Sequence, residues 1–252
     1  MLKSWRLGTF LGFPVEINVS FLLLLGLVFV AFGGLPGVLL VTLVFASVVL
    51  HELGHALVAR KLGVAVSGIE LSFFGGAAKM VQLPRTANHE LAIAAAGPAV
   101  SLVLGGLGLG LAALTHFPLF AWLGYTNLVL AGFNLIPALP MDGGRILRAL
   151  LTRKMDFVRA TDISVSVARV VAVLFGLYGL FGGAYQLLFL APFLWLMGTR
   201  EQMLARMTAD RYAYTNDGYT ERTQRWNDAP RYAAPRRFTI VQRGGRTVIE
   251  EL

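Results

Sequence analysis

Long runs of apolar residues alternate with short polar segments along the first 200 residues of the chain. A helix needs roughly 20 residues to cross a hydrocarbon core of about 30 Å. Runs close to this length predict six membrane-spanning helices, over residues 17–33, 37–59, 90–114, 120–137, 160–181 and 184–198. The fourth span is short and runs into Pro137 and Pro140, so we expect irregular backbone at its end. The pattern predicts an all-α polytopic membrane protein.

One segment between the second and third spans has a different pattern. Residues 64–84 alternate apolar and small side chains, and Gly75 and Gly76 interrupt the alternation. Alternation with a glycine break is typical of two strands joined by a turn. The segment therefore predicts a small membrane-associated β-hairpin or re-entrant loop, with an ordinary interfacial loop as the alternative.

The chain becomes polar after about residue 200. The TNDG, NDAP and AAPRR segments are typical of turns or disorder. Two apolar-alternating stretches, RRFTIVQ and RTVIEEL, flank Gly244 and Gly245 and predict a terminal β-hairpin. We therefore divide the chain into a transmembrane domain over residues 1–200 and a polar cytoplasmic tail over residues 201–252.

Composition and charge support a membrane location. Of the 252 residues, 56% are hydrophobic and 14% charged, far below the charged content of a soluble domain. The three connections at 34–36, 115–119 and 182–183 contain no Lys or Arg, which predicts that they lie outside and that both termini are cytoplasmic. The formal charge of +8 then reflects a cell-membrane topology and gives no reason to expect a nucleic-acid partner. With no cysteine, any metal must be held by His, Asp or Glu.

Residues 51–55 read HELGH inside the second predicted span. The i, i+4 spacing places His51 and His55 on one helix face, where both imidazoles can bind the same zinc ion. In such a motif the glutamate, here Glu52, is a general base that takes a proton from the attacking water. A buried carboxylate in a membrane helix costs about 2.5 kcal/mol or more, so this cluster calls for a functional partner.

A catalytic zinc site usually needs a third protein ligand. The candidates are Asp142, His89, His116, Glu70, Glu90, Asp156 and Asp162. His116 lies in an outer loop, at the wrong depth, and His89 and Glu90 suit a surface or helix-capping role. Asp142 follows the fourth span at a depth similar to that of the two histidines, between prolines and glycines that shape its backbone.

Four segments together resemble the site-2 protease family of intramembrane zinc metalloproteases. These segments are HELGH, FGGAAKM, AIAAAGPAVSLVLG and FNLIPALPMDGGRIL, in the order of that family, and the resemblance covers roughly residues 1–200. It implies one zinc per chain, with His51, His55 and Asp142 as ligands and Glu52 as the catalytic base. It also implies that Asn134 lies near the active site, where its amide holds substrate backbone or the developing oxyanion. Gly97 and Pro98 then permit close helix contact beside the site.

The implied activity is hydrolysis of a peptide bond in or near a transmembrane segment of a membrane-anchored protein substrate. Three alternatives use the same residues. They are a membrane metal-binding or metal-transport protein, a membrane zinc protease acting on prenylated C-termini, and an inactive relative that serves as a scaffold. The PDZ and CBS modules of many relatives are missing, so their regulation cannot be transferred.

Overall fold

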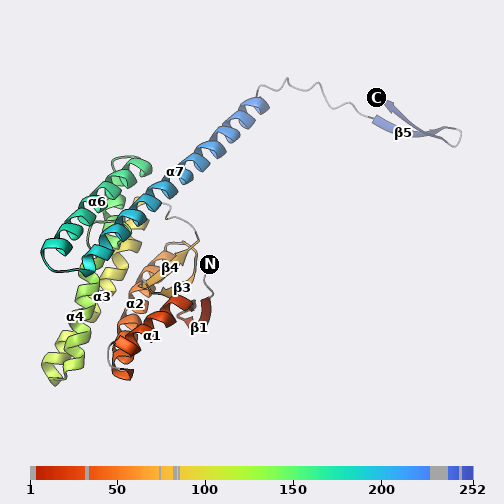
Figure 1. Ribbon diagram of the computed structural model, residues 1–252. Helices are drawn as coiled ribbons and strands as arrows, with labels where there is room; N and C mark the ends of the chain where they lie inside the picture. Colours follow the sequence, from red (N-terminus) through yellow and green to blue (C-terminus); the bar gives the residue numbers. More distant parts are fainter. Residues whose placement is uncertain are drawn as a thin grey trace. The chain divides into compact units, whose positions relative to one another are not determined.

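The computed structural model describes residues 4–31, 34–73, 75–81, 84, 86–227, 238–243 and 246–251. Its helices are α1 (Val19–Ala31), α2 (Leu35–Lys61), α3 (Ala87–Thr115), α4 (Pro118–Asn134), α5 (Asp142–Thr152), α6 (Phe157–Phe181) and α7 (Gln186–Asn227). Its strands are β1 (Ser4–Phe10), β2 (Phe13–Asn18), β3 (Val66–Ser72), β4 (Gly75–Met80), β5 (Phe238–Arg243) and β6 (Arg246–Glu251). The chain forms two compact units, Met1–Ala205 and Arg206–Leu252. Figure 1 shows these elements.

A four-stranded sheet in the order β1-β2-β3-β4 packs beside α2 in the first unit. β1 and β2 form an antiparallel hairpin, β2 and β3 are parallel, and β3 and β4 are antiparallel. Leu11 and Gly12 join the first two strands with positive φ angles of 50° and 87°, the combination that a tight two-residue hairpin turn requires. This order leaves β4 at one edge of the sheet.

Charged side chains tie three of these strands together. Lys79 on β4 lies 2.8 Å from a carboxylate oxygen of Glu70 on β3 and 3.2 Å from one of Glu16 on β2. The hydrogen bond from Lys79, supported by one from Asn18, holds the pKa of the Glu70 carboxyl below its usual range. The contacts fix the position of β4 relative to the rest of the sheet.

Buried apolar side chains attach the sheet to α2. Phe13 and Ile69 from the sheet pack against Leu53 and Ala56 of α2, all four buried. Leu53 lies inside the HELGH motif and Ala56 directly follows it. The packing therefore holds the sheet directly against the part of α2 that carries the candidate chemistry.

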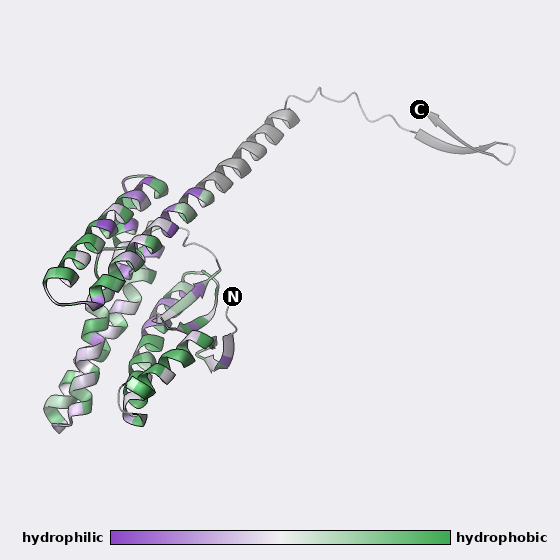
Figure 2. Cartoon of the chain, viewed as in Figure 1, coloured by the Kyte–Doolittle hydropathy of each residue, from purple (hydrophilic) through white to green (hydrophobic). Residues whose placement is uncertain are grey.

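Three helices of the described chain, α2, α3 and α6, are long and apolar enough to cross a membrane. α1 is apolar but only 13 residues long, and α4 has 17 residues. Hydrophobic residues predominate along α1 and α2 (Figure 2). A mainly helical fold with three helices that could span a membrane and a small sheet is confirmed, whereas the six-span count stays a prediction.

The sequence-based description needs two corrections. The predicted hairpin at residues 64–84 is present as β3 and β4, but it is half of a larger sheet, because residues 4–18 form strands. The fold therefore contains more β structure than the single predicted hairpin. The prediction of turns or disorder after residue 200 is wrong as far as Asn227, because α7 continues through this segment. Residues 200–207 are mostly strong helix formers, so nothing ends the helix there.

β5 and β6 pair antiparallel at the place of the predicted terminal hairpin. The AAPRR segment and the part of NDAP after Asn227 lie outside the described residues.

Candidate metal centre and active site

α2 carries the HELGH motif and presents its two histidines on one buried face. His51 is 2% exposed and His55 is 5% exposed, and their Nε2 atoms lie 3.2 Å apart. Together with the Glu52 carboxylate they form a cluster whose potential ligand atoms all lie within 4.8 Å of one another. The i, i+4 spacing therefore places the two histidines side by side on one face of α2, as the sequence predicts.

Asp142 is the first residue of α5, and its carboxylate lies beside both imidazoles. Its Oδ2 atom lies 3.1 Å from Nε2 of His51 and 3.1 Å from Nε2 of His55. The two glycines that follow allow this approach, because a Cβ atom on Gly143 or Gly144 would collide with the backbone of residues 135–139. The PMDGG sequence thus lets α5 begin close against the preceding turn and places the carboxylate beside both imidazoles.

The second nitrogen of each imidazole has a partner on α3. Nδ1 of His51 lies 2.9 Å from Oγ of Ser101, and Nδ1 of His55 lies 2.6 Å from the carbonyl oxygen of Ile93. A carbonyl can only accept, so Nδ1 of His55 carries the proton and Nε2 presents its lone pair to the centre. Such partners orient metal-binding histidines. The sequence pattern did not predict these partners, although Ser101 is a polar residue inside an apolar span.

The residues present fit a zinc ion. Three atoms with available lone pairs converge at 3.1–3.2 Å, an arrangement that is repulsive unless a proton or cation lies among them. Ligands at about 2.0 to 2.1 Å from a tetrahedral zinc lie about 3.3 Å from one another, close to this spacing. The centre therefore has the ligand types, spacing and imidazole orientation of a zinc site with one position left for substrate or water.

Glu52 is held at the edge of the sheet. Its Oε2 atom accepts a hydrogen bond of 2.9 Å from the backbone N–H of Ala78 on β4. A Cβ atom on Gly76 would come within 2.9 Å of Cγ of Glu52, so the glycine lets the strand lie against this side chain. The sheet thus orients one carboxylate oxygen of Glu52 and leaves the other free to act beside the metal centre.

The remaining candidates for the third ligand have other roles in the structure. His116 caps the end of α3, and Asp156 caps the start of α6 by accepting from the backbone N–H of Arg159 at 2.9 Å. Glu70 belongs to the cross-strand charges, and Asp162 accepts a hydrogen bond from Gln202. The backbone N–H of His89 donates to the hydroxyl of Thr86, which caps α3. Their described contacts place none of them with the two histidines.

Asn134 is half-buried at the end of α4 and donates from Nδ2 to the carbonyl oxygen of Leu130, 3.0 Å away on the same helix. The described contacts of Asn134 therefore do not connect it to the histidines or to Asp142. Its predicted role at the active site stays a prediction.

A buried ion-pair cluster that the sequence pattern did not predict joins α3, α5 and α7. Arg148 of α5 is 5% exposed, and its Nε donates to Glu90 of α3 at 2.8 Å while Nη1 donates to Glu201 of α7 at 3.2 Å. Glu90 is thus a buried ion-pair partner instead of the predicted surface or capping residue. The cluster joins the helix that holds Ile93 to the helix that begins with Asp142.

Gly97 of α3 faces the two imidazoles. A Cβ atom at this position would fall onto Nε2 of His55 and within 2.6 Å of Nε2 of His51. We therefore expect Gly97→Ala to abolish or strongly reduce zinc binding, because the methyl group would collide with both imidazole Nε2 atoms. Metal analysis of the purified variant measures this directly.

The matched control is Gly106→Ala on the same helix, where an added Cβ atom meets nothing within 4 Å. This control should retain its zinc. A Gly97→Ala protein with full zinc content would show that the imidazoles do not bind metal in this arrangement.

Comparison with known proteins agrees with this geometry. The model of peptidase family M50 matches residues 39–117 and 107–175, which include the histidines and Asp142. The chain belongs to peptidase family M50. A zinc metalloprotease of Methanocaldococcus jannaschii is 36% identical over 215 residues, which cover 82% of this chain and 63% of that protein. A Synechocystis protein is 43% identical over 172 residues, 60% of this chain and 45% of its own length.

A solved structure has the same fold. The site-2 protease from Methanocaldococcus jannaschii superposes with a TM-score of 0.63 at 37% identity, covering 79% of this chain and 95% of that one. The predicted resemblance to site-2 proteases is thus confirmed, and the buried cluster of His51, Glu52 and His55 fits a zinc site. The chain spans 63% and 45% of the lengths of the two relatives.

Proposed function

We propose that this M50 protein is an intramembrane zinc metalloprotease that hydrolyses peptide bonds in or near transmembrane segments of membrane-anchored proteins. One observation carries the proposal. Two imidazole nitrogens of α2 and one carboxylate oxygen of α5 converge at 3.1–3.2 Å beside an oriented glutamate, and α2 is long and apolar enough to cross a membrane. His51, His55 and Asp142 are the proposed ligands.

The residues around the centre have distinct proposed tasks. When bound, zinc supplies a Lewis acid that polarises the scissile carbonyl and makes water a stronger nucleophile at neutral pH. Glu52 accepts the proton of the attacking water on the oxygen that Ala78 does not hold, and then delivers it to the leaving amine. Ile93 and Ser101 keep the imidazoles oriented while the carbonyl changes geometry.

The edge strand and Asn134 are the proposed substrate contacts. Among the described strands, β4 pairs only with β3, and its Ala78 lies next to the proposed base. An extended substrate segment that pairs with β4 would therefore pass the metal centre. Asn134 has a second amide hydrogen besides the one used within α4, and this hydrogen is the proposed donor to substrate backbone or oxyanion.

The proposed topology follows from the charge pattern. Six spans within residues 1–200, both termini cytoplasmic, and a polar cytoplasmic tail over residues 201–252 place nearly all the basic residues on one side of a cell membrane. Hydrolysis would then take place near the cytoplasmic face. A metal-transport function is not favoured, because the chain belongs to a peptidase family and the proposed base has no required place in a transit site.

The substrate claim predicts sensitivity to helix stability. A peptide bond within a regular helix has its carbonyl hydrogen-bonded, so cleavage requires local unwinding. We expect a transmembrane substrate with Gly-Pro beside the cut site to be cleaved faster than one with Leu-Leu, because Gly and Pro lower the unwinding cost by about 1 and 3 kcal/mol relative to Ala. Single-turnover cleavage in vesicles measures the difference.

Equal membrane insertion of both substrates is the necessary control. Equal single-turnover rates, with chemistry rate-limiting, would mean that unwinding does not select the substrate. Absence of cleavage of either substrate, with zinc bound, would argue against the proposed protease activity itself.

A further inference from the structure

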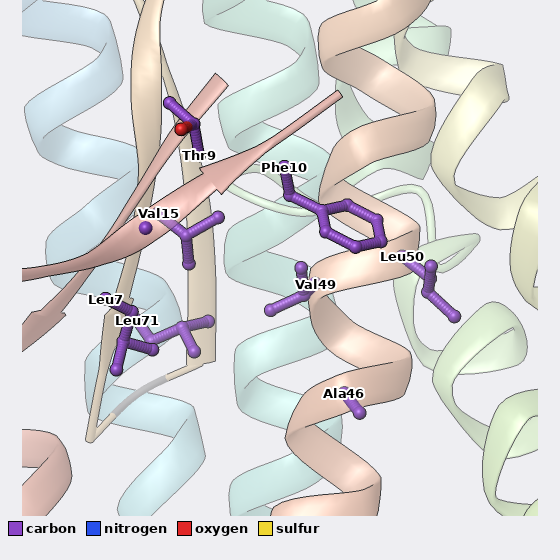
Figure 3. Close-up of a pocket in the computed structure, with 9 residues that line it drawn as sticks. Leu7, Thr9, Phe10, Val15, Ala46, Val49, Leu50 and Leu71 are labelled. Atoms are coloured by element: carbon purple, nitrogen blue, oxygen red, sulfur yellow. The ribbon is translucent and has the colours of Figure 1, made fainter. Parts of the chain in front are cut away.

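An apolar cavity of about 490 Å³ lies between β1 and α2, on the side of α2 away from the metal centre. In Figure 3, Phe10 of β1 lies beside Val49 and Leu50 of α2, while Leu7 and Leu71 lie together on the sheet side. Thr9 contributes the only polar side chain of the lining. Leu7 is 65% exposed although it borders the cavity, so the cavity opens to the surroundings of the protein.

The cavity belongs to a different face of α2 from the zinc ligands. Ala46, Val49 and Leu50 line it, and at 100° per residue their mean direction is about 160° from that of His51 and His55. A molecule in this cavity therefore does not occupy the catalytic centre. It contacts β1, the edge strand opposite β4, and the outer side of the helix that carries the motif.

Two basic residues continue the cavity face of α2. Arg60 and Lys61 each lie eleven positions after Val49 and Leu50, or three helical turns, and so project from the same face about 16 Å further along. Both are exposed. Nη1 of Arg60 donates to the carbonyl oxygen of Leu11 at 2.9 Å, so this charge lies at the β1–β2 turn, at the end of the cavity next to Phe10.

The spacing of apolar cavity and basic residues matches one leaflet of a bilayer. A leaflet holds about 15 Å of hydrocarbon below its headgroups. α2 begins at Leu35, and along the helix axis Leu50 lies about 22 Å and Arg60 about 38 Å from this residue. A hydrocarbon core of about 30 Å that starts at Leu35 therefore contains Leu50 but not Arg60. With the hydrocarbon core placed from Leu35 onward, the cavity falls within the hydrocarbon and the two cations fall at the headgroups of the same leaflet.

We propose that this face is a binding site for an anionic phospholipid of that leaflet. One acyl chain fills the cavity between β1 and α2, and the phosphate pairs with Arg60 and Lys61. Charge complementarity selects a phospholipid over a substrate transmembrane segment, because a purely apolar helix would offer no anion to the two cations. The bound acyl chain fills the space between β1 and α2. It thereby supports the sheet that holds β4 beside Glu52.

The test is photo-crosslinking of the full chain in phosphatidylcholine vesicles containing phosphatidylglycerol with a diazirine at mid-chain. Peptide mass spectrometry should find label concentrated on residues 7–15 and 46–50, above that on the exposed residues of α3 such as Leu107. Unlabelled phosphatidylglycerol should compete better than phosphatidylcholine. Each substitution Arg60→Gln or Lys61→Gln should reduce this preference about fivefold, whereas Lys154→Gln, an exposed control, should not.

A second pair of variants tests the cavity itself. Ala46→Trp should fill it and remove the concentrated label, while Val103→Trp on the exposed surface of α3 should leave the label in place. Label spread evenly over all exposed apolar helices, no preference for the anionic lipid, or displacement of the label by an apolar transmembrane peptide would each overturn the proposal. These readouts need no cleavage, so they are independent of the proposed protease activity.

Discussion

Glu52→Gln is expected to reduce cleavage of a membrane-embedded substrate by about 10²- to 10⁴-fold, the usual contribution of a general acid–base group. The amide cannot accept a proton from the attacking water. Its carbonyl oxygen can still accept the hydrogen bond from the N–H of Ala78, so the side chain should keep its place beside β4. Single-turnover cleavage in vesicles measures the rate, and metal analysis measures the zinc content of the same protein.

Zinc content separates the interpretations of this variant. The fold and about one zinc per chain should be retained, because Glu52 is not among the three converging donor atoms. Loss of zinc together with activity would make Glu52 a ligand. Wild-type cleavage by the zinc-loaded variant would exclude it as the base.

Asp142→Ala is expected to lower zinc affinity by more than about 100-fold, since even partners that only orient a ligand contribute about 10- to 100-fold. The Oδ2 atom of Asp142 is 3.1 Å from both imidazole nitrogens, and no other carboxylate in the described part of the chain lies that close to both. Competition with a chelator of known affinity measures the change.

Asp156→Ala is the matched control, because this carboxylate caps α6 and has no described contact with the histidines. The control should bind zinc like the wild type. Unchanged zinc affinity of Asp142→Ala would exclude that residue as a ligand and require another donor.

The residues of the centre were accessible from sequence because their chemistry is local. The i, i+4 spacing alone puts His51 and His55 on one face, and the position of Asp142 just after the fourth predicted span gives it a similar depth. The partners of the histidines were not accessible in this way. Ile93 contributes only a backbone carbonyl, so its role depends on how α3 packs against α2.

The first two strands show that apolar content alone does not predict secondary structure reliably. Residues 4–18 contain alternation on both sides of Leu11 and Gly12, a signal of a hairpin, but the adjacent apolar run favoured a single membrane helix beginning at about residue 17. Parallel pairing of β2 with β3 joins segments about 50 residues apart. Sequence patterns of each segment alone do not contain that pairing.

The most direct test of the account uses purified protein in vesicles with one transmembrane substrate, followed by mass spectrometry of the products. The account predicts a cut within or beside the substrate's apolar segment, loss of cleavage when a chelator removes the metal, and recovery when zinc is restored. Cleavage that continues at the same rate in fully metal-free protein would contradict it.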